Sequence, residues 1–233
     1  MEEDLLTKSF FLINLNGQIE SCTVVGDQYD NLYCKFLFRY GPDWAPIRTD
    51  SIRSSSSLTK IVSSKDGIED EGNVTNEDKF FDKVFISQTA NKRLEDHQPI
   101  FVWNLPFEAT FKSTNPFGWP QIVVSVYGID SVGNDVIRGY GWLHLPTQPG
   151  WHRLSIRLFS PQSSTLLDRI LNWFVESRRP EFVDSRMVAG DEGRHLVTVQ
   201  NEPESVVNLT LNILFKDFKK YGFKSKNCQC NCR

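Results

Sequence analysis

Residues 115–146, "NPFGWPQIVVSVYGIDSVGNDVIRGYGWLHLP", decide the fold because they hold two apolar runs joined by an acidic loop. The runs "QIVVSVYG" and "DVIRGYGWLHL" are rich in β-branched and aromatic residues. Pro, Gly, Asn or Asp bounds each run, which is typical of strands that end in turns. The stretch therefore predicts two strands, with "NPFGWP" as a rigid lead-in and "GIDSVGND" as the connecting loop.

An earlier run, "NLYCKFLFRYG", predicts a further strand and fixes its orientation. Side chains alternate between the two faces of a strand. One face of this run is fully apolar and is predicted to look into the core: Cys34, Phe36, Phe38 and Tyr40. The opposite face carries a mixed set: Tyr33, Lys35, Leu37 and Arg39.

The N-terminal run "SFFLINLNGQIESCTVV" contains the dipeptide Asn16-Gly17 between two extended segments. Asn and Gly tolerate the positive φ angles that a type I′ turn demands. The pattern therefore predicts a β-hairpin with its turn at Asn16-Gly17.

The other segments complete an all-β class. Strands are expected in "PIFVWNLPFEATFKS", "WHRLSIRLF", "RHLVTVQ" and "SVVNLTLNILFKDF", whereas "FFDKVFIS" fits a strand or a short helix. Residues 164–178 have helical spacing of apolar residues, with Ser164 as a possible N-cap and Pro180 as the stop. The sequence thus predicts an antiparallel β-sandwich of about eight strands with one lateral α-helix.

Composition divides the chain into one domain with flanking tails. Residues 48–79 are rich in Ser, Asp and Glu without sustained periodicity, which predicts a disordered surface insertion. We expect residues 1–8 to form an N-terminal tail, residues 9–218 the domain, and residues 219–233 a basic, Cys-rich tail. For the terminal thiols Cys228, Cys230 and Cys232, a frayed tail and palmitoylation both remain open.

Charge and motifs narrow the function classes. The 233 residues carry a net charge of -3, which argues against a global grip on nucleic acid. The acidic start "MEEDLLTKSFFLINLNG" does not resemble a signal peptide, so a cytosolic rather than secreted protein is expected. The chain has no Gly-x-Ser-x-Gly elbow, no phosphate-cradling loop and no zinc-type spacing of His and Cys. Neither an enzyme nor a cofactor is predicted.

Two groups of residues remain as candidate sites. Asp130 and Asp135 share one loop and could approach a calcium ion, but calcium takes 6–8 oxygen ligands, so a plain connecting loop is favoured. A basic run near the C-terminus could approach anionic lipid headgroups, or could be the solvated end of a strand: Lys216, Lys219, Lys220, Lys224 and Lys226.

Long pieces of the chain resemble the B9 domain family, a divergent relative of the C2 domain. They include "TFKSTNPFGWPQIVVSVYG", "GNDVIRGYGWLHLP", "QPGWHRLSIRLF", "YDNLYCKFLFRYGPDWAP" and "RRPEFVD". The resemblance implies a C2-like sandwich and a non-enzymatic scaffold of the tectonic-like (Meckel syndrome) complex. It places that scaffold at the cytoplasmic side of the ciliary base, in the transition zone, basal body and axoneme.

The implied partners are two other B9-domain proteins and tectonic-type and coiled-coil proteins. The implied role is a gate for ciliary membrane proteins that supports cilium assembly and hedgehog signalling. An alternative is a peripheral lipid-binding module of the C2 type that acts directly on a membrane.

Overall fold

The computed structural model describes residues 10–24, 30–47, 84–95, 98–129, 133–161, 181–182, 184–190 and 199–223. The predicted tail at 1–8, the insertion at 48–79 and the helix at 164–178 lie outside these residues. The described part is almost entirely β-structure. Its strands are β1 (Phe11–Thr23), β2 (Asn31–Arg39), β3 (Trp44–Ile47), β4 (Phe85–Ile86), β5 (Ala90–Asn91), β6 (Arg93–Glu95), β7 (Gln98–Ser113), β8 (Gln121–Ile129), β9 (Asp135–His144), β10 (Gly150–Pro161) and β11 (Val199–Lys216).

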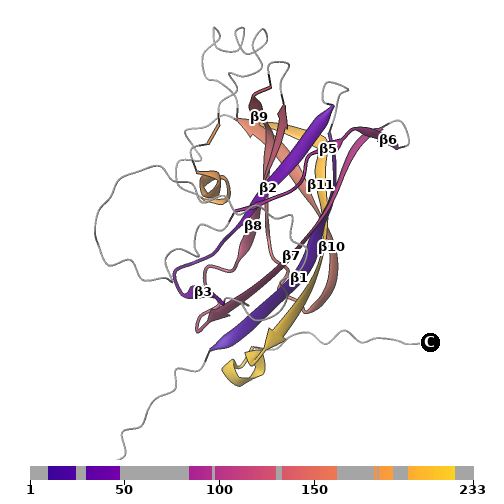
Figure 1. Cartoon of the computed structure of the whole chain (residues 1–233). Coiled ribbons are helices and arrows are strands. Elements are labelled where there is room, and N and C mark those ends of the chain that lie inside the picture. Colours follow the sequence, from indigo (N-terminus) through magenta and orange to yellow (C-terminus); the bar gives the residue numbers. More distant parts are fainter. Residues whose placement is uncertain are drawn as a thin grey trace, which may run out of the picture.

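The strands form one curled antiparallel sheet in the order β3-β7-β1-β11-β10-β9-β8-β2-β4, with β5 beside β2 and β6 beside β7 (Figure 1). The joint between β10 and β9 is narrow, since only Phe159 and Tyr140 pair there. The sheet therefore turns a corner at this point and folds its two halves over a common core. The predicted antiparallel all-β class is confirmed.

The main core lies between the two halves of the sheet. Phe36 on β2 packs against Phe107 on β7 with ring centroids 5.2 Å apart, and Phe38 packs against Phe111 at 5.5 Å. The predicted inward face of β2 is confirmed, because Cys34, Phe36 and Phe38 belong to this core. The side chains of Cys22 and Cys34 are buried in this core.

The opposite face of β2 is also covered, which the sequence did not predict. Tyr33 and Leu37 belong to a second, smaller apolar cluster that includes Val188 and Ala189. Those two residues come from the short 3-10 helix η3 (Ser185–Ala189). The Arg39 guanidinium fixes this helix, since it donates a 2.8 Å hydrogen bond to the carbonyl of Ala189.

The predicted hairpin at Asn16-Gly17 is wrong. These residues lie inside β1, which runs without a turn from Phe11 to Thr23 between β7 and β11. Gly17 serves close packing instead: a Cβ at this position would lie 2.5 Å from the carbonyl oxygen of Thr210. A glycine within a strand often marks such a close approach.

The C-terminal strand also differs from the prediction. The sequence predicts two strands here, in "RHLVTVQ" and "SVVNLTLNILFKDF". The structure has one continuous strand, β11, over residues 199–216. A shift in register opposite Arg157 and Leu158 absorbs the polar segment "NEPE" at residues 201–204. For the ambiguous run "FFDKVFIS", the structure shows a short strand at β4.

The lead-in "NPFGWP" crosses the Gly-containing turn in "RYGPDW". Gly41 donates a backbone hydrogen bond of 2.8 Å to the carbonyl of Gly118. The indole of Trp44 donates to the carbonyl of Phe117 at 2.8 Å. The stretches "RYGPDW" and "NPFGWP" therefore lock together at one end of the sandwich. The described part of the chain has no helix with the length and apolar character needed to span a membrane.

Candidate functional site

The basic cluster lies at the end of the sandwich where β11 stops. Lys216 is the last residue of β11, and Lys219 and Lys220 lie in the 3-10 helix η5 (Phe218–Tyr221) at the base of Figure 1. All three lysines are exposed. Lys224 and Lys226 lie outside the described residues.

The aromatic residues between these lysines face inward. Phe218 packs against Phe11 with ring centroids 4.5 Å apart, and Tyr221 and Phe223 also contact Phe11 at 5.7 and 5.8 Å. These rings close the end of the core, so the segment at 218–223 presents its charges rather than its aromatic rings to the outside. One charge is paired locally: Lys220 lies 2.8 Å from Asp217. This contact lowers the pKa of Asp217 below its ordinary value.

Of the two candidate calcium residues, only Asp135 can be placed, near the opposite end of the sheet. Asp130 is outside the described residues. Asp135 begins β9, is exposed, and interacts with the phenol of Tyr33. Among the described residues, no three His, Cys, Asp or Glu side chains gather as a metal site would require. The preference for a plain loop stays a prediction.

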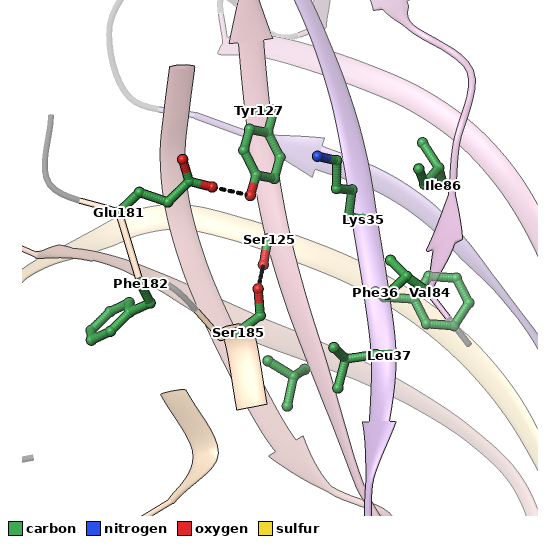
Figure 2. Close-up of a pocket in the computed structure, with 11 residues that line it drawn as sticks. Lys35, Phe36, Leu37, Val84, Ile86, Ser125, Tyr127, Glu181, Phe182 and Ser185 are labelled. Atoms are coloured by element: carbon green, nitrogen blue, oxygen red, sulfur yellow. Dashed lines mark hydrogen bonds between the residues drawn. The ribbon is translucent and has the colours of Figure 1, made fainter. Parts of the chain in front are cut away.

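A hollow of about 270 Å³ lies between β2, β8 and the segment that leads into η3 (Figure 2). Its apolar lining comes from Leu37, Val84, Ile86, Val123 and Phe182. Lys35 and Leu37 on β2 are paired with Ser125 and Val123 on β8, so these four side chains lie on the same face of the sheet and line the hollow together.

Polar groups line the other part of the hollow. The ammonium of Lys35 lies 4.1 Å from the centre of the Tyr127 ring, which places a cation over an aromatic face. On the far side, the Tyr127 phenol donates a 2.5 Å hydrogen bond to Glu181. Deeper in, Ser125 donates to the hydroxyl of Ser185 at 3.3 Å (Figure 2).

Burial raises the pKa of the Tyr127 phenol well above its ordinary value, and the bond to Glu181 adds to the shift. Burial likewise raises the pKa of Tyr33 and Tyr140. The three phenols are therefore neutral at neutral pH. The hollow offers an apolar recess with Lys35 and Glu181 at its polar margin, an arrangement that suits the docking of a partner's side chain.

Sequence reasoning did not identify this hollow. The mixed face of "NLYCKFLFRYG" was a usable signal, since Tyr33 and Leu37 on a supposedly outer face imply a second covering layer. Glu181 and Ser185 come from "RRPEFVDSR", far along the chain, and no local pattern places them beside β2.

A family model described as "Ciliary basal body-associated, B9 protein" matches residues 13–214 of the chain. The chain belongs to the B9 family. The match runs from β1 almost to the end of β11, so the whole sandwich is the B9 unit. The family resemblance of the sequence is thereby confirmed.

Named relatives agree with the B9 assignment. The chain is 44% identical to B9 domain-containing protein 1 of Xenopus laevis over 217 residues, which are 93% of this chain and 90% of the relative. It is 42% identical to the Homo sapiens protein of the same name over 215 residues, covering 92% and 87%. B9 domain-containing protein 2 of Xenopus laevis is 28% identical over 123 residues, covering 53% and 68%.

Proposed function

We propose that the chain is a non-enzymatic scaffold at the ciliary transition zone, where it joins other B9-domain proteins in a tectonic-like complex. The complex would act as a barrier that controls which membrane proteins enter the cilium, and would support cilium assembly and hedgehog signalling. The single observation that carries this proposal is the match to the B9 family along the entire sandwich.

The geometry supports a binding role. The hollow beside β2 has a recess for an apolar side chain and a lysine at its rim. Its two serine hydroxyls bond to each other, and the described residues that line it include no histidine. Such a recess with a polar margin is typical of a place where a partner's side chain docks.

Loss of the gene in ciliated cells tests the proposed function. We expect shortened or absent cilia, loss of ciliary exclusion of plasma-membrane proteins, and rescue by the tagged chain, which should concentrate at the ciliary base. A tagged chain that rescues nothing and spreads evenly through the cell would contradict the proposal.

A second candidate function is direct contact with a membrane. The observation that favours it is the exposed group Lys216, Lys219 and Lys220 at one end of the sandwich. A scaffold beneath a membrane can use both kinds of contact, and each can fail without the other.

A further inference from the structure

The outer face of the sheet half formed by β7, β1, β11 and β10 has an ordered pattern. Directly opposed residues on neighbouring antiparallel strands share a face. Ile13 and Ile213 are buried in the core, so their neighbours along the strands point outward. The outward rows can therefore be read from the pairing.

Three outward rows lie near the end of β11. Leu12 pairs with both Lys112 and Lys216. In the next row Asn14 pairs with Thr110 and Leu214, and in the third Asn212 lies between Asn16 and Trp151. Lysines, a leucine and a tryptophan thus lie on one surface of the sheet.

Most cations on this surface have no ion-pair partner in the part of the chain that the structure describes. Within the described residues, Lys112, Lys216, Lys219 and Arg153 form no ion pair, whereas Lys220 pairs with Asp217 and Lys92 pairs with Asp30. Two carboxylates share the face outside the row of Lys112, Leu12 and Lys216. Glu108 lies two rows from Lys112 on β7, and Glu20 lines one hollow with Trp151 and Arg153 and accepts a hydrogen bond from Thr210. The end near Lys216 is therefore the basic end.

Two large apolar side chains stand out beside these cations. Trp151 is 76% exposed at the start of β10, and Leu214 is 52% exposed on β11. The side chains around them on the strands are amides and hydroxyls that bond to one another, such as Asn14 to Thr110. An exposed tryptophan among cations suits the boundary between lipid headgroups and acyl chains.

We propose that this face, defined by Leu12, Lys112, Trp151, Arg153, Leu214 and Lys216, docks on an anionic lipid surface, with Trp151 and Leu214 entering the headgroup layer. The cations attract the anionic headgroups, and Lys219 and Lys220 extend the contact past the end of β11. The inference rests on the second candidate function and goes beyond it, because it assigns the face and its apolar anchors.

Sedimentation of the full chain with phosphatidylcholine vesicles, with and without phosphatidylserine, tests this proposal. We expect binding only with phosphatidylserine, and weakening with added salt. Trp151→Ala should weaken binding by about tenfold, as expected when a large apolar side chain no longer enters the lipid. Lys112→Glu with Lys216→Glu should remove most of the salt-sensitive part.

A second readout does not depend on affinity. Brominated phosphatidylcholine in the same vesicles should quench the tryptophan fluorescence of the unaltered chain, and Trp151→Phe should lose most of that quenching while still binding. Matched controls lie on β6, at the far end of β7: Leu94→Ala removes a side chain that is 71% exposed, and Arg93→Glu reverses an exposed charge. Both should bind as the unaltered chain does.

The outcomes separate the levels of the proposal. If the unaltered chain binds and both Trp151 variants match it in binding and quenching, this face is not the lipid contact, although direct membrane contact stands. If the unaltered chain binds no anionic vesicle even at low salt, the face and the second candidate function both fail. The scaffold function is untouched by either result.

Discussion

Two glycines from distant parts of the chain meet where "RYGPDW" crosses "NPFGWP". Gly118 has φ of 71°, and a Cβ there would lie 2.5 Å from the Cα of Gly41. We expect Gly118→Ala to lower the free energy of unfolding by about 2–4 kcal/mol, since it adds a backbone clash to left-handed strain. Urea unfolding measures the loss.

Gly133→Ala is the matched control for Gly118→Ala. Gly133 also has positive φ, 96°, but a Cβ there would have no heavy atom within 4 Å. It should cost about 1 kcal/mol, from strain alone. Equal losses at both positions would show that the crossing of the two turns does not depend on close approach.

Val124 is fully buried between the two halves of the sheet. Val124→Asp should abolish cooperative folding, because an unpaired carboxylate in an apolar core costs several kcal/mol. Thermal melting followed by circular dichroism checks this. Ile129→Asp, at the 46% exposed end of the same strand, should stay folded. A folded, soluble Val124→Asp protein would mean that β8 is not a core strand.

Residues 181–182 and 184–190 cover the second face of β2, β8 and β9 and place three tyrosines in surroundings of low polarity. Tyr127 donates to Glu181, and Tyr140 accepts a 3.1 Å hydrogen bond from the backbone of Phe182. Burial raises the pKa of Tyr33, Tyr127 and Tyr140 in the folded chain. The covering segment is therefore held by neutral phenols.

This arrangement predicts alkaline sensitivity. A raised folded-state pKa gives stability that is complete below the ordinary phenol value, about 10, and is lost as pH rises above it. The melting temperature should thus fall as the pH rises from about 10 to about 12, more steeply than in Tyr127→Phe. Identical pH profiles for the two proteins would contradict the role given to Tyr127.

The insertion predicted at residues 48–79 lies between β3 and β4 in the chain. Its Ser-rich, acidic composition predicts that it adds nothing to the core. Replacing it with a short Gly-Ser linker should leave the melting temperature nearly unchanged, because loop length changes the closure entropy only slowly. A loss of several kcal/mol in unfolding free energy would show that the insertion packs on the sandwich.

Across the whole molecule, strands whose pattern is local were predictable. The alternation in "NLYCKFLFRYG" and the apolar run "QIVVSVYG" were placed correctly as β2 and β8. The prediction at Asn16-Gly17 failed because the same dipeptide fits a hairpin turn and a strand that needs Gly for close packing. The pairing of β1 with β7 and β11 determines which of the two structures forms.

Among the candidate sites, too, only features that lie within one stretch of sequence were predictable. The lysines of the basic cluster were visible in one stretch of sequence. The hollow was not predictable, because a segment about 150 residues along the chain from β2 forms one of its walls. The face around Trp151 was not predictable either, because it depends on the pairing of four strands. Leu214 and Lys216 are neighbours on one face of β11, and only the register of the sheet brings Trp151 to the same surface.

Affinity purification of the tagged chain from ciliated cells, followed by mass spectrometry, tests the central claim most directly. The scaffold function predicts recovery of other B9-domain proteins and tectonic-type proteins in amounts comparable with the chain itself. The Val124→Asp variant, which should not fold, is the control and should recover none of them. Recovery of the folded chain alone, with no B9-domain or tectonic-type protein above the control, would contradict the account.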